Sequence, residues 1–231
     1  MILNSRNGQG NRLLGTLYRL GDCARNCISG HQAQKMAGFL NCAGVLSVDP
    51  QNTRLGWVGK ETTFAEKTVV DFVRAAPITA PQKILHVGIG NGNTGRSLRR
   101  DGVEIIGISI DGEEITNSRQ IYNSTHLVNK YAVSELRSRL GNSKFRWIVD
   151  VNLFSYACCW GHAIRYLWFL CEHLMEGGSI VTHASGGRYA PRGIMLTPLL
   201  LERVTQIVEM QVTTHPEGVI LITRKQGECY S

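Results

Sequence analysis

The chain of 231 residues is 43% hydrophobic, contains six prolines and carries a formal net charge of +7. This length and composition support one substantial hydrophobic core with an extension, and they exclude a disordered chain or a short-period repeat protein. The positive charge is compatible with an anionic partner such as nucleic acid, phospholipid or a nucleotide sugar. The basic residues are scattered, however, and only Arg96, Arg99 and Arg100 form a dense group, so nucleic-acid binding is the less favoured alternative.

Cysteine usage and the start of the chain indicate the compartment. The seven cysteines lack the paired spacing of a secreted disulfide framework, and the first residues lack the continuous apolar segment of a signal peptide. No stretch reaches the roughly 18 apolar residues of a membrane-spanning helix. We therefore predict a cytoplasmic protein without a transmembrane segment, with a transit peptide as the weaker alternative.

Residues 1–80 are predicted to form a helical arm or lid. Leucines near the start of the chain follow a helical spacing, and Asp49–Thr53 has the composition of a turn. A further helix is predicted from about Thr63 to Ala75, with Thr62 or Thr63 as its cap.

Two groups of cysteines in the sequence raise the question of a metal or a reactive thiol. Cys23, Cys27 and His31 recur every four residues, and Cys42 follows them. The spacing describes the buried face of an amphipathic helix as well as it describes metal ligands, and no C-x-x-C pair supports a site, so we predict no metal. The adjacent pair Cys158–Cys159 has no flanking base, which favours packing over nucleophilic chemistry.

Residues 81–231 alternate between apolar runs and stretches with room for a helix. The runs are KILHVGIG, VEIIGISI, FRWIVDVN and GGSIVTHAS, with a weaker run, THLVNK, near residue 125. The segments VTQIVEMQV and GVILITRKQ, joined by TTHPE, predict an antiparallel hairpin. This pattern predicts a doubly wound α/β domain whose mostly parallel, Rossmann-like sheet ends in a C-terminal antiparallel hairpin, with ligands bound at the carboxyl ends of the strands.

The first apolar run leads into a glycine-rich turn that contains Gly88, Gly90 and Gly92. A turn this tight needs backbone angles that side chains with a Cβ disfavour, and a ligand must approach its backbone closely. The run Gly90-x-Gly92-x-x-Gly95 also fits a dinucleotide fingerprint, with Asp111 near the usual distance for a ribose contact. An NAD(P)-dependent oxidoreductase is therefore an alternative, although such an enzyme usually needs a substrate domain that this chain has no room for.

From Lys83 to about Gln226 the sequence resembles the class I S-adenosylmethionine-dependent methyltransferases. The resemblance rests on Gly88, Gly90 and Gly92 after the first strand, on Leu174-Met-Glu-Gly-Gly before the strand SIVTH, and on the terminal hairpin. It implies S-adenosyl-L-methionine as the cofactor and methyl transfer as the reaction.

The sequence departs from that family at the positions expected to bind the cofactor. His86 replaces the acid that precedes the first glycine, and Ser109 replaces the acid that ends the second strand. Asp111 offers paired acceptors for the ribose hydroxyls, or else it belongs to a solvated turn. Asn129 is the candidate for the adenine contact.

The remaining candidate residues follow the fourth and fifth strands. The resemblance places Asp150 and Asn152 where polar groups face the transferable methyl, and helix capping is the alternative for either residue. Methyl transfer to oxygen needs a base for the hydroxyl proton, which histidine supplies near neutral pH. His183 is the first candidate base and His162 the second.

The acceptor is predicted to be a small molecule or a saccharide. The segment VDVNLFSYACCWGHAI and the early H-x-G-x-G-N turn resemble bacterial methyltransferases of glycan and nodulation-factor decoration, including those that methylate a fucose hydroxyl. A catalytically silent, nucleic-acid-associated protein with this fold is a further alternative.

Overall fold

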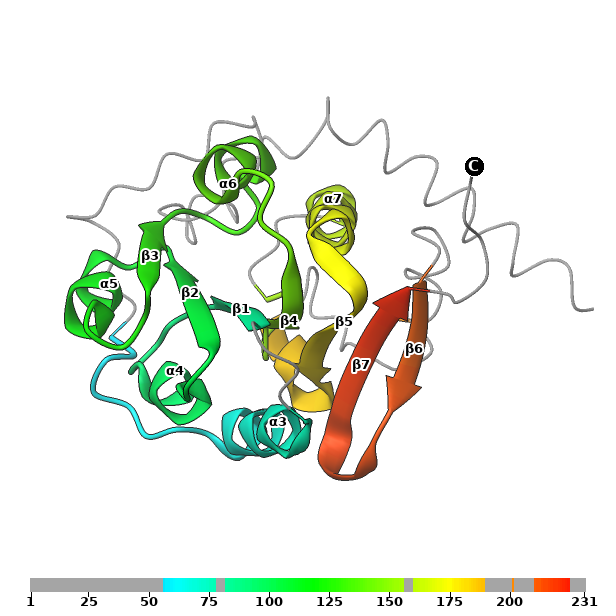
Figure 1. Ribbon diagram of the computed structural model, residues 1–231, viewed down its shortest axis with the longest axis horizontal. Helices are drawn as coiled ribbons and strands as arrows, with labels where there is room; N and C mark the ends of the chain where they lie inside the picture. The colour runs from blue at the N-terminus through cyan, green and yellow to red at the C-terminus, as the bar shows by residue number, and fades with distance from the viewer. Residues whose placement is uncertain (1–55, 78–81, 156–159, 190–200, 202–209, 225–231) are drawn as a thin grey trace, which may run out of the picture.

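The computed structural model describes residues 56–77, 82–155, 160–189, 201 and 210–224 (Figure 1). The helices are α3 (Phe64–Ala75), α4 (Asn93–Leu98), α5 (Gly112–Ser118), α6 (Val133–Leu140) and α7 (Trp160–Glu172), with 3₁₀ turns η1 (Ala184–Tyr189) and η3 (Pro216–Gly218). The strands are β1 (Gln82–Val87), β2 (Val103–Ser109), β3 (Ser124–Leu127), β4 (Phe145–Val149), β5 (Leu174–His183), β6 (Met210–Thr214) and β7 (Val219–Arg224). Most of the predicted arm, with its cysteines, and the pair Cys158–Cys159 lie outside the described residues.

Within the described residues, the strands form one seven-stranded sheet in the order β3-β2-β1-β4-β5-β7-β6. Strands β1 to β5 pair in parallel, whereas β7 is antiparallel to both β5 and β6. The predicted Rossmann-like sheet with a terminal antiparallel hairpin is confirmed. Strand order reverses between β1 and β4, so the carboxyl ends of these two strands flank the crevice in which such sheets bind ligands.

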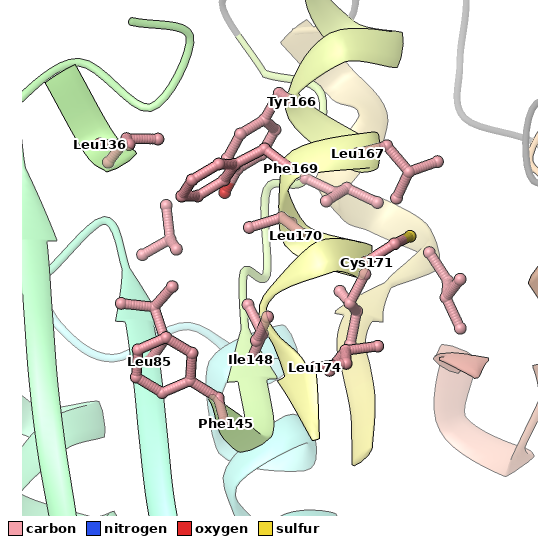
Figure 2. Packing of buried hydrophobic residues seen from close by; sticks show 14 of the residues in the cluster. Leu85, Leu136, Phe145, Ile148, Tyr166, Leu167, Phe169, Leu170, Cys171 and Leu174 are labelled. Carbon is pink, nitrogen blue, oxygen red and sulfur yellow. The ribbon is translucent and has the colours of Figure 1, made fainter. Parts of the chain in front are cut away.

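Alternating side chains of the strands build a hydrophobic core on each face of the sheet. On one face, Leu85 and Ile148 pack with residues of α6 and α7, among them Tyr166 and Phe169 (Figure 2). On the other face, the neighbouring strand residues Ile84 and Trp147 pack with α3, α4 and α5, with Val69, Val73, Leu98 and Ile115 as buried contacts. The helices therefore cover both faces of the sheet, as Figure 1 shows.

Local sequence signals account for the helix starts. Thr63 caps α3, and a capping box is complete because Thr63 accepts a hydrogen bond from the Glu66 amide while the Glu66 carboxylate accepts one from the Thr63 amide. The predicted α3 is therefore confirmed with Thr63, rather than Thr62, as its cap. Helix α4 starts at Asn93, with Gly92 as N-cap. None of the helices in the described ranges has both the length and the apolar character needed to cross a membrane.

Candidate functional site

A cavity of about 520 Å³ opens at the carboxyl ends of the strands, beside the glycine turn. Its volume falls within the roughly 300–1,000 Å³ typical of small-molecule sites. Aromatic and polar side chains from the approach to α3 and its first turn form one part of the wall, and the residues after β1 to β5 form the rest. The sequence candidates that line the cavity are Gly88, Gly90, Ser109, Asn129, Asp150, Asn152 and His183.

The glycine turn owes its shape to backbone angles that only glycine adopts readily. Gly88, Gly90 and Gly92 have φ values of 78°, 58° and 79°. Gly88 and Gly90 line the cavity, whereas Gly92 does not, because it packs against α5 and the segment after it. A Cβ added to Gly92 would lie 2.9 Å from both the Ile121 Cδ1 and the Ser118 Oγ. One side of the turn is thus held by packing at Gly92, and the other side, at Gly88 and Gly90, faces the cavity.

Glu114, which the sequence analysis did not single out, joins the glycine turn to the end of β2. The Gly90 amide donates to Glu114 Oε2 at 2.9 Å, and the Ser109 hydroxyl donates to the same oxygen at 2.7 Å. Glu114 is 2% exposed and lines the cavity. Burial raises the pKa of Glu114 above its ordinary value, and the hydrogen bonds from Ser109 and Gly90 oppose that shift.

Asp111 caps α5, a role that was not among the two predicted for it. It is fully buried, which contradicts the solvated turn, and it does not line the cavity. Its Oδ1 accepts hydrogen bonds from the amides of Glu113 and Glu114 at 2.8 and 3.4 Å, so it caps α5. This cap turns Glu114 toward Ser109 and Gly90, and it leaves the ribose role of Asp111 without support from its position.

His86, at the position of the family's acid, lies beneath the glycine turn. Its Nδ1 lies 2.6 Å from the Tyr122 hydroxyl, and the two rings stack. The Tyr122 ring fills space left by two residues without a Cβ, Gly95 and Gly107. Burial lowers the pKa of His86 to about 4, so the imidazole is neutral at pH 7. A neutral histidine–tyrosine pair therefore supports the turn from below.

Asp150 is the centre of a buried polar cluster at the end of β4. Lys130 Nζ lies 3.0 Å from its Oδ2 and 3.3 Å from its Oδ1, and it also donates to the Asn152 carbonyl at 2.7 Å. The Tyr166 hydroxyl donates to Oδ2 at 2.9 Å, and the Asn152 amide donates to Oδ1 at 3.1 Å. Burial lowers the pKa of Lys130, and the adjacent carboxylate opposes that shift. Both oxygens of Asp150 are therefore already used by the protein.

His183 lies at the end of β5 in the wall of the cavity and is 6% exposed. Its Nε2 lies 2.7 Å from the Glu217 carbonyl oxygen, which only accepts, so the proton is assigned to Nε2. Its Nδ1 accepts from the Ser185 amide at 3.1 Å and lies 2.7 Å from the Ser185 hydroxyl. Ser185 also lines the cavity, so it connects the imidazole with the open space.

The last three sequence candidates differ in their positions. Asn129 lines the cavity, and its Oδ1 accepts from the Tyr131 amide at 2.9 Å, which fixes the turn after β3. Asn152 is exposed and lines the cavity. His162 is buried on α7 and does not line the cavity, so its role as a base gains no support. No group of metal ligands gathers within the part of the chain that the structure describes.

Comparison with known proteins gives the fold. No protein-family model and no curated protein sequence matches the chain. Among solved structures, a TehB-like SAM-dependent methyltransferase from Corynebacterium glutamicum aligns at 18% identity and a TM-score of 0.52, covering 74% of this chain and 92% of its own. A SAM-dependent methyltransferase from Bacteroides fragilis, solved with S-adenosyl-L-homocysteine, aligns at 14% identity and 0.51, covering 74% and 82%.

A third similar structure is the sugar N-methyltransferase KedS8 from a Streptoalloteichus species. It aligns at 13% identity and a TM-score of 0.54, covering 73% of this chain and 90% of its own. All three alignments extend over most of both chains at low identity, and they agree with the strand order described above. The chain therefore has the fold of the class I S-adenosylmethionine-dependent methyltransferases.

Proposed function

We propose that this protein is an S-adenosylmethionine-dependent methyltransferase. The observation that carries the proposal is the hydrogen bond between the Gly90 amide and the buried Glu114 carboxylate inside the glycine turn. The diphosphate of a dinucleotide would need hydrogen bonds from the amides of this turn. Here the Gly90 amide already donates to the Glu114 carboxylate, whose negative charge would also repel a diphosphate. An adenosyl sulfonium presents uncharged ribose hydroxyls in such a turn. The geometry thus favours the methyl donor over NAD(P).

The charges around the cavity support the same choice. Among the described residues, four acids line it, Glu61, Glu66, Glu114 and Asp150, against two lysines, Lys60 and Lys130. This acidic cavity lies in a chain with a formal net charge of +7, so the negative potential is local. A cationic donor is favoured in such a site and an anionic dinucleotide is disfavoured. The open glycine turn and the cavity volume also fit the adenosyl group.

S-adenosyl-L-methionine would supply a methyl group made electrophilic by its sulfonium. We propose that His183 and Ser185 remove the proton of the methyl acceptor. The Glu217 carbonyl holds the imidazole proton on Nε2, which leaves Nδ1 basic. Ser185 would give its hydroxyl proton to Nδ1 as it takes the proton of the acceptor hydroxyl. The acceptor oxygen would bond to the methyl carbon as the bond from that carbon to the sulfonium sulfur breaks, with the electron pair of the broken bond left on sulfur.

Asp150 acts in this proposal as a positioning residue. Both of its oxygens are occupied by Lys130, Tyr166 and the Asn152 amide, so it is not free to take a proton. It instead holds Lys130 against the floor of the cavity, where the ammonium also lies 5.5 Å from the ring centroids of Tyr131 and Tyr166.

The proposed acceptor is a hydroxyl group of a small molecule or saccharide, such as a glycan or a nodulation-factor fucose. Two aromatic side chains in the cavity wall are partly open to solvent, Trp57 at 38% and Phe64 at 66% exposed. Aromatic faces of this kind, in a cavity that Asn152 and Ser185 also line, suit a ring with alternating apolar and hydroxyl faces. Because one similar structure is a sugar N-methyltransferase, an amino group on a sugar is the second candidate.

A methyl-transfer screen tests the function. With labelled S-adenosyl-L-methionine, we expect label to enter a glycan, a nucleotide sugar or another small acceptor. We expect RNA to stay unlabelled; labelled RNA would favour the nucleic-acid alternative. No transfer to any acceptor class, together with no donor binding, would contradict the proposal.

Substitution of His183 tests the proton relay. His183→Asn removes the basic Nδ1, and we expect the transfer rate to fall by roughly 10²- to 10⁴-fold. His126→Asn, on β3 and outside the cavity, is the matched control and should keep the wild-type rate. A wild-type rate in His183→Asn, or a larger loss in His162→Ala, would show that the relay is wrong.

A further inference from the structure

Glu114 uses only one of its two carboxylate oxygens within the protein. The Gly90 amide and the Ser109 hydroxyl both donate to Oε2. Oε1 has no hydrogen-bond partner in the described parts of the chain, although the residue is 2% exposed and lines the cavity. A carboxylate offers about four lone-pair positions, so acceptor capacity is left over for a ligand.

The surroundings of Glu114 specify which ligand groups suit that capacity. Nearby acids, Asp111 and Glu66, exclude another anion at this point, and no lysine or arginine is paired with Glu114 in the described residues. The suitable ligand group is therefore a hydrogen-bond donor rather than an anion. Two adjacent hydroxyls, as in a ribose, would place two donors on one carboxylate.

The Ser109 hydroxyl fixes the direction of the open oxygen. Ser109 Oγ accepts from the Asp111 amide at 3.0 Å and so directs its own proton to Glu114 Oε2. With Oε2 held by Ser109 and by Gly90, the carboxylate is locked in one orientation between the end of β2 and the glycine turn. A site that is rigid before binding loses little conformational freedom when its ligand enters.

We propose that Glu114, five residues beyond the end of β2, binds the ribose diol of the nucleoside ligand and is the residue that selects a nucleoside over a diphosphate in this turn. The inference rests on the proposed function, since it concerns the same cavity. It assigns to an acid on the first turn of α5 a contact that the sequence pattern assigned to Ser109 or Asp111.

Calorimetric titration with S-adenosyl-L-homocysteine and its 2′-deoxy and 3′-deoxy analogues tests the assignment. We expect the wild-type protein to bind the intact nucleoside roughly 10- to 100-fold more tightly than either analogue, because each loses a hydrogen bond to a charged group. In Glu114→Gln this preference should largely disappear. Glu113→Gln is the matched control, since Glu113 is the adjacent exposed acid on the same turn and does not line the cavity.

The outcomes separate this inference from the proposed function. If the wild type binds S-adenosyl-L-homocysteine but does not distinguish the deoxy analogues, or if Glu114→Gln keeps the full preference, the role of Glu114 is overturned and the methyltransferase proposal stands. If the wild type does not bind S-adenosyl-L-homocysteine, both are overturned. If thermal melting shows that Glu114→Gln does not fold, Ser109→Ala replaces it and should lower the affinity, whereas wild-type affinity in Ser109→Ala would overturn the role.

Discussion

Two regions beside the cavity satisfy their polar groups in opposite ways. In the turn region, formed by Gly88–Gly92, Ser109 and Glu114, the buried carboxylate keeps one oxygen without a partner in the described residues. In the strand-end region, formed by Lys130, Asp150, Tyr166, His183 and Ser185, both carboxylate oxygens and both imidazole nitrogens have protein partners.

This difference separates ligand binding from stability. A group whose hydrogen-bonding capacity is open gains its partner only when the ligand arrives, so changing it should weaken binding. A group already paired inside the protein contributes to the folded state, so changing it leaves a buried partner unsatisfied. The turn region is therefore expected to determine affinity, and the strand-end region to combine chemistry with fold stability.

The largest expected effect on stability comes from Asp150→Ala. The change leaves Lys130 without its counter-charge. This ion pair is largely buried, because the side chains of Lys130 and Asp150 are only 15% and 2% exposed. We expect the free energy of unfolding, measured with urea, to fall by about 3–5 kcal/mol. Glu104→Ala breaks the exposed Lys83–Glu104 pair and should cost no more than about 1 kcal/mol. Equal losses in the two variants would remove the contrast between the regions.

The support beneath the turn region should give a pH-dependent stability. Because the pKa of His86 lies near 4 in the folded protein, against 6.5 ordinarily, the unfolded chain binds a proton first as the pH falls. The contribution of His86 to the free energy of unfolding is therefore fully present above pH 6.5. It decreases as the pH falls toward 4, by about 3 kcal/mol in all. His86→Gln should flatten that decrease, measured by urea unfolding at several pH values. Glu104→Gln is the surface control and should keep the wild-type pH dependence. If the free energy of unfolding of His86→Gln also kept that dependence, a buried neutral imidazole would be contradicted.

A smaller effect is expected at Gly186, the residue after Ser185 of the strand-end region. A Cβ on Gly186, in η1, would lie 1.8 Å from the Val151 carbonyl oxygen, so Gly186→Ala must displace the segment that carries Ser185. We expect a loss of about 1–3 kcal/mol in thermal or urea unfolding. Gly59→Ala, where a Cβ meets no atom within 4 Å, should be nearly neutral. Similar stabilities for the two variants would show that the loop adjusts without cost.

The sequence predicted the sheet and the strand-end candidates because local patterns determine both. Apolar runs locate the strands, and parallel strands bring their carboxyl ends to one edge, which is why Asp150 and His183 could be placed near the cavity. The cap formed by Asp111 was also within reach of local reasoning, since an aspartate followed by acids is a common helix start.

The contacts that define the turn region could not be read in this way. Glu114 reaches Gly90 over 24 positions in the sequence, and Lys130 reaches Asp150 over 20. Neither contact follows from the periodicity of the sequence. Each joins residues that follow two different strands, so it depends on how the segments after those strands pack together. The family's acids are absent at positions 86 and 109, and the sequence does not show which residue replaces them. Glu114 reaches the glycine turn only because α5 packs against it.

Calorimetric titration of the wild-type protein with S-adenosyl-L-methionine and, separately, with NAD and NADP tests the central claim most directly. The acidic cavity and the carboxylate in the glycine turn predict saturable binding of the sulfonium nucleoside and no binding of either dinucleotide. Binding of NAD or NADP without binding of S-adenosyl-L-methionine would contradict the account.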